Sequence, residues 1–160
     1  MAYRIGFGTD YHQLVTGRKL WLGGIEIPHS KGAHGHSDAD VLLHAICDAL
    51  LGALNLGDIG VHFPDTDPDL KDIDSKILLE KTIKLIHEKG YQVVNLDSMV
   101  SLEKPKIMSF VPQMQSVIAR ILFVGPDDIS IKATTTEKLG FVGREEGLMA
   151  QAVVLLRKPD

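Results

Sequence analysis

The spacing of apolar and polar residues predicts four main strands, a small hairpin and three helices. Two short apolar segments, residues 20–22 and 25–27, flank Gly23-Gly24 and predict a tight hairpin. The other strands are expected over residues 3–14, 91–102, 129–134 and 147–157, and the helices over residues 38–56, 75–89 and 110–123. Helices between non-adjacent strands imply crossover connections. We therefore expect an α+β, two-layer α/β arrangement: a mixed four-stranded sheet with helices on one face, plus the N-terminal hairpin.

The first helix, over residues 38–56, is apolar around most of its circumference and should be buried on several sides. Ser37 is its predicted N-cap, with Asp40 as a capping-box-like partner. Asp40, His44 and Asp48 fall four residues apart and form one polar stripe. An ordinary solvated face explains this stripe as readily as a functional site does.

Two polar segments carry no regular pattern. Residues 29–36 contain glycine and several histidines and are expected to form a mobile loop. Residues 58–69 contain too many turn-forming residues for regular structure.

Composition narrows the class of protein. The 160 residues suit one domain, 1–160, with a hydrophobic core, and 44% hydrophobic with 24% charged residues is ordinary for a soluble protein. The net charge of −4 and the lack of a basic run argue against nucleic-acid binding. The one cysteine, Cys47, cannot form an internal disulfide. No signal peptide and no apolar run near the ~18 residues of a membrane span are visible, so a cytoplasmic location without membrane contact is expected.

Three residues near the start of the chain suggest a metal site. Asp10 and His12 are two apart in an extended segment and therefore face the same side. With His44 they form a set of three ligands, which leaves a tetrahedral zinc ion one open position and so indicates catalysis. Spacing alone fits hydrogen-bonded or surface residues as well. The nearby polar residues that could support such ligands are His36, Asp38, Asp40 and Asp48.

A second informative stretch is residues 132–141, where three threonines end a strand and lead to Glu137. Hydroxyl and backbone N–H groups at a strand end suit phosphate oxygens, and a carboxylate suits Mg²⁺. Lys132 and Lys138 favour an anion there, although a threonine-rich strand end with a solvated glutamate is the alternative. Two metals and a phosphate point to phosphoryl chemistry. No phosphate-binding loop, dinucleotide fingerprint or nucleophile elbow accompanies them.

Together these motifs resemble the 2-C-methyl-D-erythritol 2,4-cyclodiphosphate synthase family of the non-mevalonate isoprenoid pathway, and the resemblance covers nearly the whole chain. The matching segments are residues 10–12, 36–40 with His44, 58–60, 63–68, 104–106 and 132–141. The resemblance implies a phosphorus–oxygen lyase whose substrate is 4-diphosphocytidyl-2-C-methyl-D-erythritol 2-phosphate. The 2-phosphate attacks the β-phosphorus, closes a ring and expels CMP.

The resemblance also implies cofactors and an assembly. Zn²⁺ would be held by Asp10, His12 and His44, and Mg²⁺ or Mn²⁺ by Glu137, between the α- and β-phosphates. The family is a homotrimer with active sites at subunit interfaces, which agrees with the apolar first helix.

Residue roles follow from the same resemblance. His36 and Thr135 would stabilise the transition state. The residues matching substrate contacts are Asp10, His12, His36, Ser37, Asp58, Ile59, Gly60, Phe63, Asp65, Asp67, Thr136 and Glu137. Those matching the cytidine pocket are Leu102, Lys104, Pro105, Lys106, Ile107, Met108, Ala133, Thr134 and Thr135. Phe141 and Arg144 match a central cavity reported to hold isoprenoid diphosphates, with Glu146 able to pair with Arg144.

The sequence departs from the family pattern at three positions. Phe7 and Thr9 stand where many members carry His and Phe, and Glu103 introduces a charge into the cytidine segment. Two rival functions stay open: a metal-dependent phosphohydrolase and a non-catalytic nucleotide- or isoprenoid-binding module. Identifying the reaction products separates the three.

Overall fold

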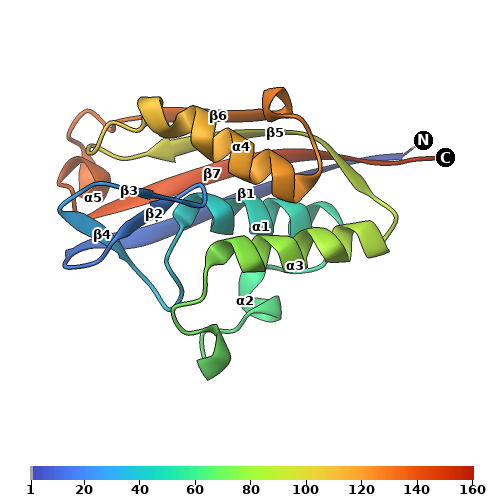
Figure 1. The fold of residues 1–160 in the computed structure, drawn as a ribbon, viewed down its shortest axis with the longest axis horizontal. Helices are drawn as coiled ribbons and strands as arrows, with labels where there is room; N and C mark the ends of the chain where they lie inside the picture. Colours follow the sequence, from blue (N-terminus) through green and yellow to red (C-terminus); the bar gives the residue numbers. More distant parts are fainter. Residues whose placement is uncertain (1) are drawn as a thin grey trace.

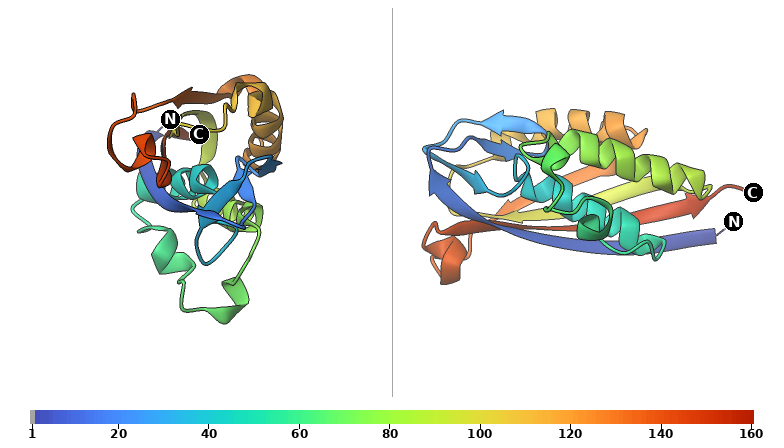
Figure 2. Two further views of the ribbon diagram at one scale, coloured as in Figure 1. Left: turned by 90° about the vertical axis from the view of Figure 1, so that its left-hand side faces the viewer. Right: turned by 90° about the horizontal axis from the view of Figure 1, so that it is seen from below.

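The computed structural model describes residues 2–160 and shows a sheet with its helices on one face (Figures 1 and 2). The sheet has five strands, in the order β4-β1-β7-β5-β6. They are β1 (Ala2–Thr16), β4 (Lys31–His34), β5 (Gln92–Ser101), β6 (Ile129–Thr134) and β7 (Gly147–Lys158). A separate hairpin joins β2 (Leu20–Leu22) to β3 (Ile25–Ile27). The expected α+β class, mixed sheet and hairpin are confirmed.

The expected number of strands is wrong. Residues 31–34, predicted as part of a mobile loop, form the edge strand β4, which pairs with β1 from Gln13↔His34 to Thr16↔Lys31. This segment is polar and only four residues long, so it has no apolar alternation that would indicate a strand. Its pairing comes from main-chain bonds to β1, which runs two residues further than predicted. The sheet is mixed because β5 and β6 are parallel while the other pairs are antiparallel.

Three long helices cover the sheet: α1 (Val41–Ala53), α3 (Ser75–Glu88) and α4 (Val111–Leu122). The shorter ones are α2 (Ile59–His62), α5 (Gly140–Gly143) and the 3-10 turns η1 (Pro68–Leu70), η2 (Met108–Phe110) and η3 (Pro126–Asp128). The prediction of no regular structure for 58–69 is therefore wrong in part, because the Asp58 and Asp67 side chains cap α2 and η1. None of the helices in residues 2–160 is both long and apolar enough to cross a membrane.

The helix α1 packs directly on β1 at two glycines. A Cβ atom on Gly6 would lie 1.8 Å from the Ala49 carbonyl oxygen, and one on Gly8 would lie 2.0 Å from that of Ala45. Only glycine permits this approach, and it brings the α1 backbone against the strand that carries Asp10.

The predicted start of α1 is wrong. The N-cap is Asp40, whose side chain accepts a hydrogen bond from the Leu43 N–H group. Ser37 cannot start the helix because Ala39 has a φ of 58°, which interrupts the helical turn. The polar stripe of α1 is not a solvated face either: Asp40 is fully buried and His44 is 9% exposed.

Candidate metal centre and cleft

Asp10 and His12 on β1 converge with His44 on α1, as the spacing predicted. The His12 Nε2 atom lies 2.9 Å from Asp10 Oδ2, and the His44 Nδ1 atom lies 3.1 Å from the same oxygen. The two ring nitrogens are 3.1 Å apart. These three atoms form a nearly equilateral triangle.

The triangle fits a tetrahedral zinc ion. Ligand bonds of about 2.0–2.1 Å at tetrahedral angles place neighbouring ligand atoms about 3.3 Å apart, which is close to the observed separations. Two imidazoles and one carboxylate are also a ligand set that zinc prefers. Three protein ligands would leave a fourth position for substrate, and two of these ligands, His12 and His44, line a cleft. We call these three residues the triad.

The neighbours of His44 orient its ring for metal binding. The Ser75 hydroxyl donates a hydrogen bond to Asp38 Oδ1, so its oxygen is free to accept from His44 Nε2 at 2.9 Å. The Ser37 hydroxyl lies 3.2 Å from the same nitrogen. With its proton on Nε2, His44 presents the lone pair of Nδ1 to the triad. The predicted supporting role of Asp38 therefore acts through Ser75.

Electrostatics inside the triad favour a cation. Burial opposes ionisation of Asp10, but hydrogen bonds from His12 and His44 lower its pKa to about 2. Burial likewise opposes the charged form of His44, yet the Asp10 carboxylate raises the pKa of that imidazole above its ordinary value. A metal ion can bind between an ionised carboxylate and two imidazoles, because it displaces the proton that these groups share.

Asp40 has a structural role. Its carboxylate accepts hydrogen bonds from Gly23 N–H at 3.0 Å and Gly24 N–H at 2.7 Å, besides the Leu43 N–H at the start of α1. Burial, with the neighbouring Asp38 charge, raises the pKa of Asp40 to about 6. The aspartate thus ties the β2–β3 hairpin to α1 and does not touch the triad atoms.

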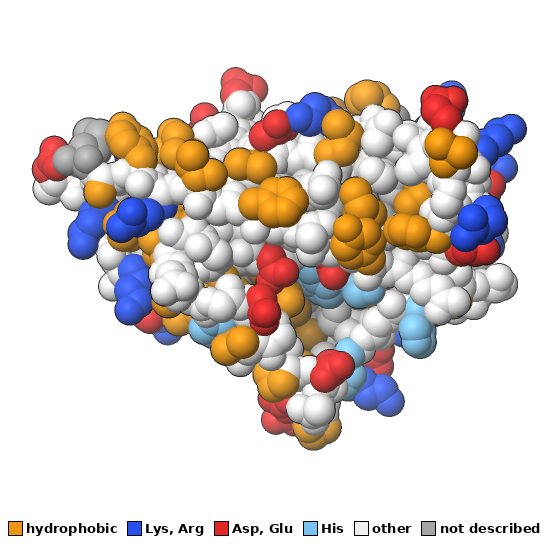
Figure 3. Space-filling view, turned by 180° about the vertical axis from the view of Figure 1, so that it is seen from behind, with side chains coloured by type: hydrophobic (Ala, Val, Ile, Leu, Met, Phe, Trp, Pro, Cys, Tyr) orange, Lys and Arg blue, Asp and Glu red, His pale blue; other side chains and the backbone are white. Residues whose placement is uncertain are grey.

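A cleft of about 560 Å³ opens beside the triad, and Figure 3 shows histidine side chains in this hollow. The site residues predicted from the sequence that line it are His12, His36, Ser37, His44, Ile59, Gly60, Phe63 and Asp65. Pro64 and Thr66, within the predicted segment 63–68, also line it, and the walls that sequence reasoning missed as site residues are Gly35, Leu70, Ile73 and Leu78. Asp48 holds the floor of this region in place by accepting a 2.7 Å hydrogen bond from the Ile59 N–H group.

His36 stands in the cleft wall in a fixed orientation. Its Nε2 atom lies 3.0 Å from the Asp67 carbonyl oxygen, which can only accept, so Nε2 carries the proton. The main chain around it is anchored as well: the His36 carbonyl accepts from Asp72 N–H, and Arg18 donates to the Ser37 carbonyl at 2.9 Å. The next residue, Ser37, is buried at the triad.

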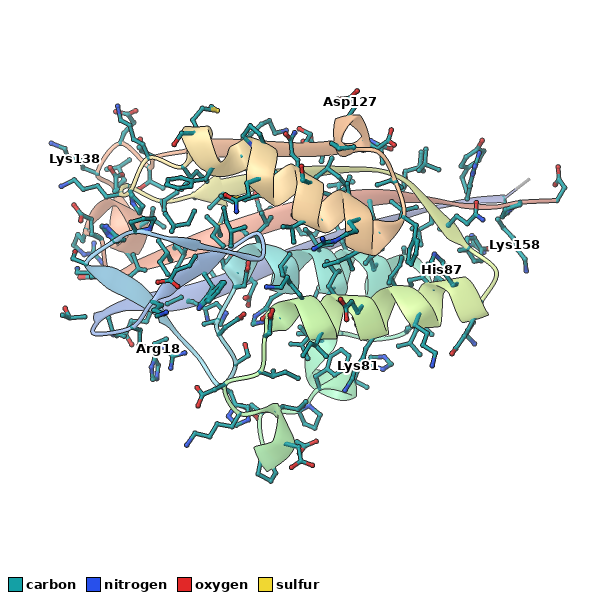
Figure 4. All side chains as sticks on the ribbon, in the orientation of Figure 1. Arg18, Lys81, His87, Asp127, Lys138 and Lys158 are labelled. Atoms are coloured by element: carbon teal, nitrogen blue, oxygen red, sulfur yellow. The ribbon has the colours of Figure 1, made fainter. Side chains whose placement is uncertain are left out.

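The remaining predicted site residues lie elsewhere. Across the sheet, Asp10 on β1 pairs with Ala150 on β7, Ala150 pairs with Val100 on β5, and Val100 pairs with Ala133 on β6. Ala133 is therefore three strands away from Asp10, or about 14 Å at the usual strand spacing. None of residues 102–108 or 133–137 lines the cleft. Figure 4 places Lys138 at the upper left-hand end of the molecule, whereas α2 lies in its lower part. One chain thus does not bring Glu137 to its own triad.

Phe141 and Arg144 form a third location, at the end of the sheet. The Phe141 ring is 6.1 Å from that of Tyr11, and the Arg144 guanidinium makes two 3.0 Å hydrogen bonds to Glu146. The predicted Arg144–Glu146 pair is confirmed.

Comparisons with known proteins agree with one another. The model of the YgbB family matches residues 3–157. A 2-C-methyl-D-erythritol 2,4-cyclodiphosphate synthase from Bacteroides thetaiotaomicron is 61% identical over 158 residues, covering 99% of both chains. The bifunctional IspDF from Campylobacter jejuni superposes with a TM-score of 0.95 at 42% identity, over 99% of this chain and 43% of that one. The CDP complex of IspF from Plasmodium falciparum has a TM-score of 0.88 at 33% identity, over 99% and 98%.

Proposed function

The chain belongs to the YgbB family, whose relatives are named for 2,4-cyclodiphosphate synthesis, and we propose how its own residues carry out that reaction. Cyclodiphosphate synthesis in isoprenoid biosynthesis, a lyase activity, is the function that these relatives support. The observation that carries the proposal within this chain is the triad, with its nearly equilateral donor atoms opening into a cleft.

We assign Zn²⁺ to the triad and 4-diphosphocytidyl-2-C-methyl-D-erythritol 2-phosphate to the cleft. A bound zinc ion supplies positive charge that offsets repulsion between the two phosphates that must meet. The remaining cleft residues shape the space in which the erythritol part folds. Asp58 and Asp67 hold α2 and η1, and with them the walls at Ile59, Gly60, Phe63 and Asp65.

The reaction is a balanced exchange of phosphorus–oxygen bonds. An oxygen of the 2-phosphate forms a bond to the β-phosphorus, and the bond from that phosphorus to the oxygen shared with the α-phosphate breaks. The electron pair leaves with CMP, and no water is consumed. Both reacting groups belong to one molecule, so holding them in line supplies much of the rate. His36, fixed by Asp67 in the cleft wall, and Thr135 would stabilise the developing charge.

Thr135 and Glu137 would come from a second copy of the chain. They lie beyond the end of β6, about 14 Å across the sheet from the triad of their own chain. A ring of three copies, each placing residues 133–137 and 102–108 against the triad of its neighbour, would complete three sites. The cytidine would bind to those two segments, and Glu137 would hold Mg²⁺ or Mn²⁺, which prefer oxygen ligands.

The surface for such an assembly is the sheet face without helices. It exposes large apolar residues, and Figure 3 shows them spread along that face. They include Tyr3, Ile5, Phe7, Tyr11 and Val153. An apolar patch of this extent is typical of a protein–protein contact. Phe141 and Arg144 would then border the centre of the trimer, where an isoprenoid diphosphate could bind.

The reaction is tested by product analysis. Incubation of the purified protein with the cytidyl substrate, Zn²⁺ and Mg²⁺ should release CMP and a cyclic diphosphate in equimolar amounts. A linear monophosphate or diphosphate in place of the cyclic product would indicate water as the nucleophile, and the proposal would fail.

The shared site is tested by mixing two inactive variants. His12→Ala removes the triad half, and Glu137→Gln removes the other half, so each variant alone should be nearly inactive. In mixed trimers assembled from equal amounts, about a quarter of the sites should contain two intact halves and recover wild-type turnover. A mixture as inactive as its components would show that both halves come from the same chain.

A further inference from the structure

Glu103, the charged residue that departs from the family pattern in the cytidine segment, makes hydrogen bonds within its own chain. This half-buried residue follows β5, and its carboxylate lies against the backbone that follows β6. The Oε1 atom accepts hydrogen bonds from the Thr136 N–H group at 3.1 Å and from the Lys138 N–H group at 3.2 Å. The Thr136 hydroxyl lies 3.4 Å from the same oxygen. One carboxylate oxygen thus accepts hydrogen bonds from the N–H groups of both residues that flank Glu137.

The segment held in this way has a conformation that needs support. Glu137 and Lys138 have φ values of 52° and 63°, in the left-handed region that disfavours side chains. Both residues are exposed, so no core packing maintains the backbone there. The far side is limited by α5, where a Cβ atom on Gly143 would lie 2.1 Å from the Lys138 carbonyl carbon. Residues 135–139 are therefore held between Glu103 and α5.

This conformation determines what the loop 135–139 presents. The Glu137 N–H group donates to the Thr135 hydroxyl oxygen at 3.3 Å, so that hydroxyl keeps its hydrogen for an outside acceptor. The negative charge of Glu103 strengthens both N–H bonds relative to a neutral acceptor.

We propose that Glu103 is a positioning residue for the reaction: its carboxylate holds the loop 135–139 so that Thr135 and Glu137 reach the substrate in a fixed geometry. This inference rests on the proposed function of Thr135 and Glu137. It assigns Glu103 no contact with the cytidine, although residues 102–108 surround it in sequence. Since displacements of about 1 Å at a reacting centre can cost about 100-fold in rate, a loose loop would lower turnover more than binding.

The test compares three substitutions at one position. Glu103→Ala should lower kcat by about 10- to 100-fold while KM changes less, and should raise the Mg²⁺ concentration needed for half-maximal activity. Glu103→Gln keeps an oxygen acceptor and should retain at least about a third of the turnover. Glu103→Asp keeps the charge but withdraws the oxygen by one methylene, so it should fall between the two. Glu80→Ala, an exposed glutamate on α3, is the matched control and should behave as the wild type.

A second readout does not depend on activity. Amide hydrogen exchange over residues 134–141, measured without substrate or added metal, should be faster in Glu103→Ala than in the wild type and unchanged in Glu80→Ala. Circular dichroism checks that each variant folds. If Glu103→Ala does not fold, Glu103→Asp provides the same comparison.

Three results would overturn the inference: wild-type kcat and exchange in Glu103→Ala, a raised KM with unchanged kcat, or a Glu103→Gln variant as impaired as Glu103→Ala. Its failure is distinguishable from failure of the proposed function. If the wild type forms no cyclic product or Glu137→Gln is fully active, the proposed function is wrong. If both behave as proposed while the Glu103 variants do not, only the positioning role is wrong.

Discussion

The triad and the loop 135–139 are the two proposed halves of one site, and they are built in opposite ways. The triad joins the strand β1 to the buried helix α1, and the two backbones approach so closely that only glycine is tolerated on β1 at the contact. The loop 135–139 is exposed, contains two consecutive residues with positive φ, and is held by hydrogen bonds that its Thr136 and Lys138 N–H groups donate to Glu103. The first half is thus fixed by the core of its own chain, whereas the second is fixed by a few polar contacts at an edge.

This difference indicates a division of tasks. Zinc ligands must stay within a few tenths of an ångström of one geometry, and a packed core provides that accuracy. The loop must meet another chain and a substrate that enters and leaves, so it belongs at the surface. Substitutions in the triad half should therefore change zinc content and stability, and substitutions in the loop half should change turnover and the Mg²⁺ requirement while the zinc content stays the same.

The largest effect is expected at the triad. His12→Ala leaves two donors, so the protein should lose most of its zinc and at least about 1,000-fold in activity. Added Mg²⁺ should not restore activity, because it binds imidazole poorly. Metal analysis and turnover test this variant together. Full zinc occupancy after His12→Ala would show that the triad is not the zinc site.

The next effect concerns the loop half. Glu137→Gln should keep its zinc, because Glu137 is remote from the triad, and should lose about 100-fold in turnover. Raised Mg²⁺ or Mn²⁺ should restore part of the activity, since substrate phosphates still offer oxygen ligands. Zinc content and turnover against Mg²⁺ concentration separate the two halves. An unchanged Mg²⁺ requirement would place the second ion on other residues.

A smaller effect tests the packing under the triad. Gly8→Ala places a methyl group against the Ala45 carbonyl, so α1 must move away from β1, at a cost of about 1–3 kcal/mol in unfolding free energy. The same shift should weaken zinc binding. Gly52→Ala is the matched control, because its Cβ would meet only the Phe7 carbonyl at an ordinary 3.8 Å. It should gain about 0.5–1 kcal/mol, since alanine favours the helix.

Denaturation with and without a chelator distinguishes packing from metal loss. If Gly8→Ala is as stable as the wild type in both conditions, the close approach of α1 and β1 is not what positions His44.

Local patterns predicted most of the fold. The strand β6 has the bounds that its apolar pattern predicted, and α3 differs by one residue at its end. The edge strand β4 was missed because its pairing depends on β1 and not on its own residues. The start of α1 was misplaced because the positive φ of Ala39 follows from how the chain enters the core.

The candidate site was predicted unevenly for a similar reason. Asp10 and His12 could be found because a two-residue spacing on a strand is a local signal, and His44 then completed a recognisable set of three ligands. Ser75 could not, since its bond to His44 joins residues 31 positions apart. Glu103 stood out only as a charge in an unexpected place, because its partners lie 33 and 35 residues further along the chain. What sequence alone could not provide was tertiary contact between polar groups.

The smallest effect is expected at Lys132, which was predicted to favour an anion near the threonines. Its ammonium group lies 2.6 Å from Asp97 Oδ2 on the neighbouring strand, so its charge is already paired within the chain. Lys132→Met should therefore change KM and kcat by less than about twofold and stability by less than about 1 kcal/mol, as for an exposed ion pair.

The pH dependence of the stability that this pair contributes has a defined sign, because the hydrogen bond from Lys132 lowers the pKa of Asp97 below its ordinary value of 3.8. The stability that the pair contributes is present above that ordinary value and is lost as the pH falls through the lowered pKa. Unfolding curves between pH 2 and pH 7 should thus differ slightly at neutral pH and converge in acid. A tenfold rise in KM would instead mean that Lys132 leaves Asp97 and binds the substrate, and the loop half would then extend along β6.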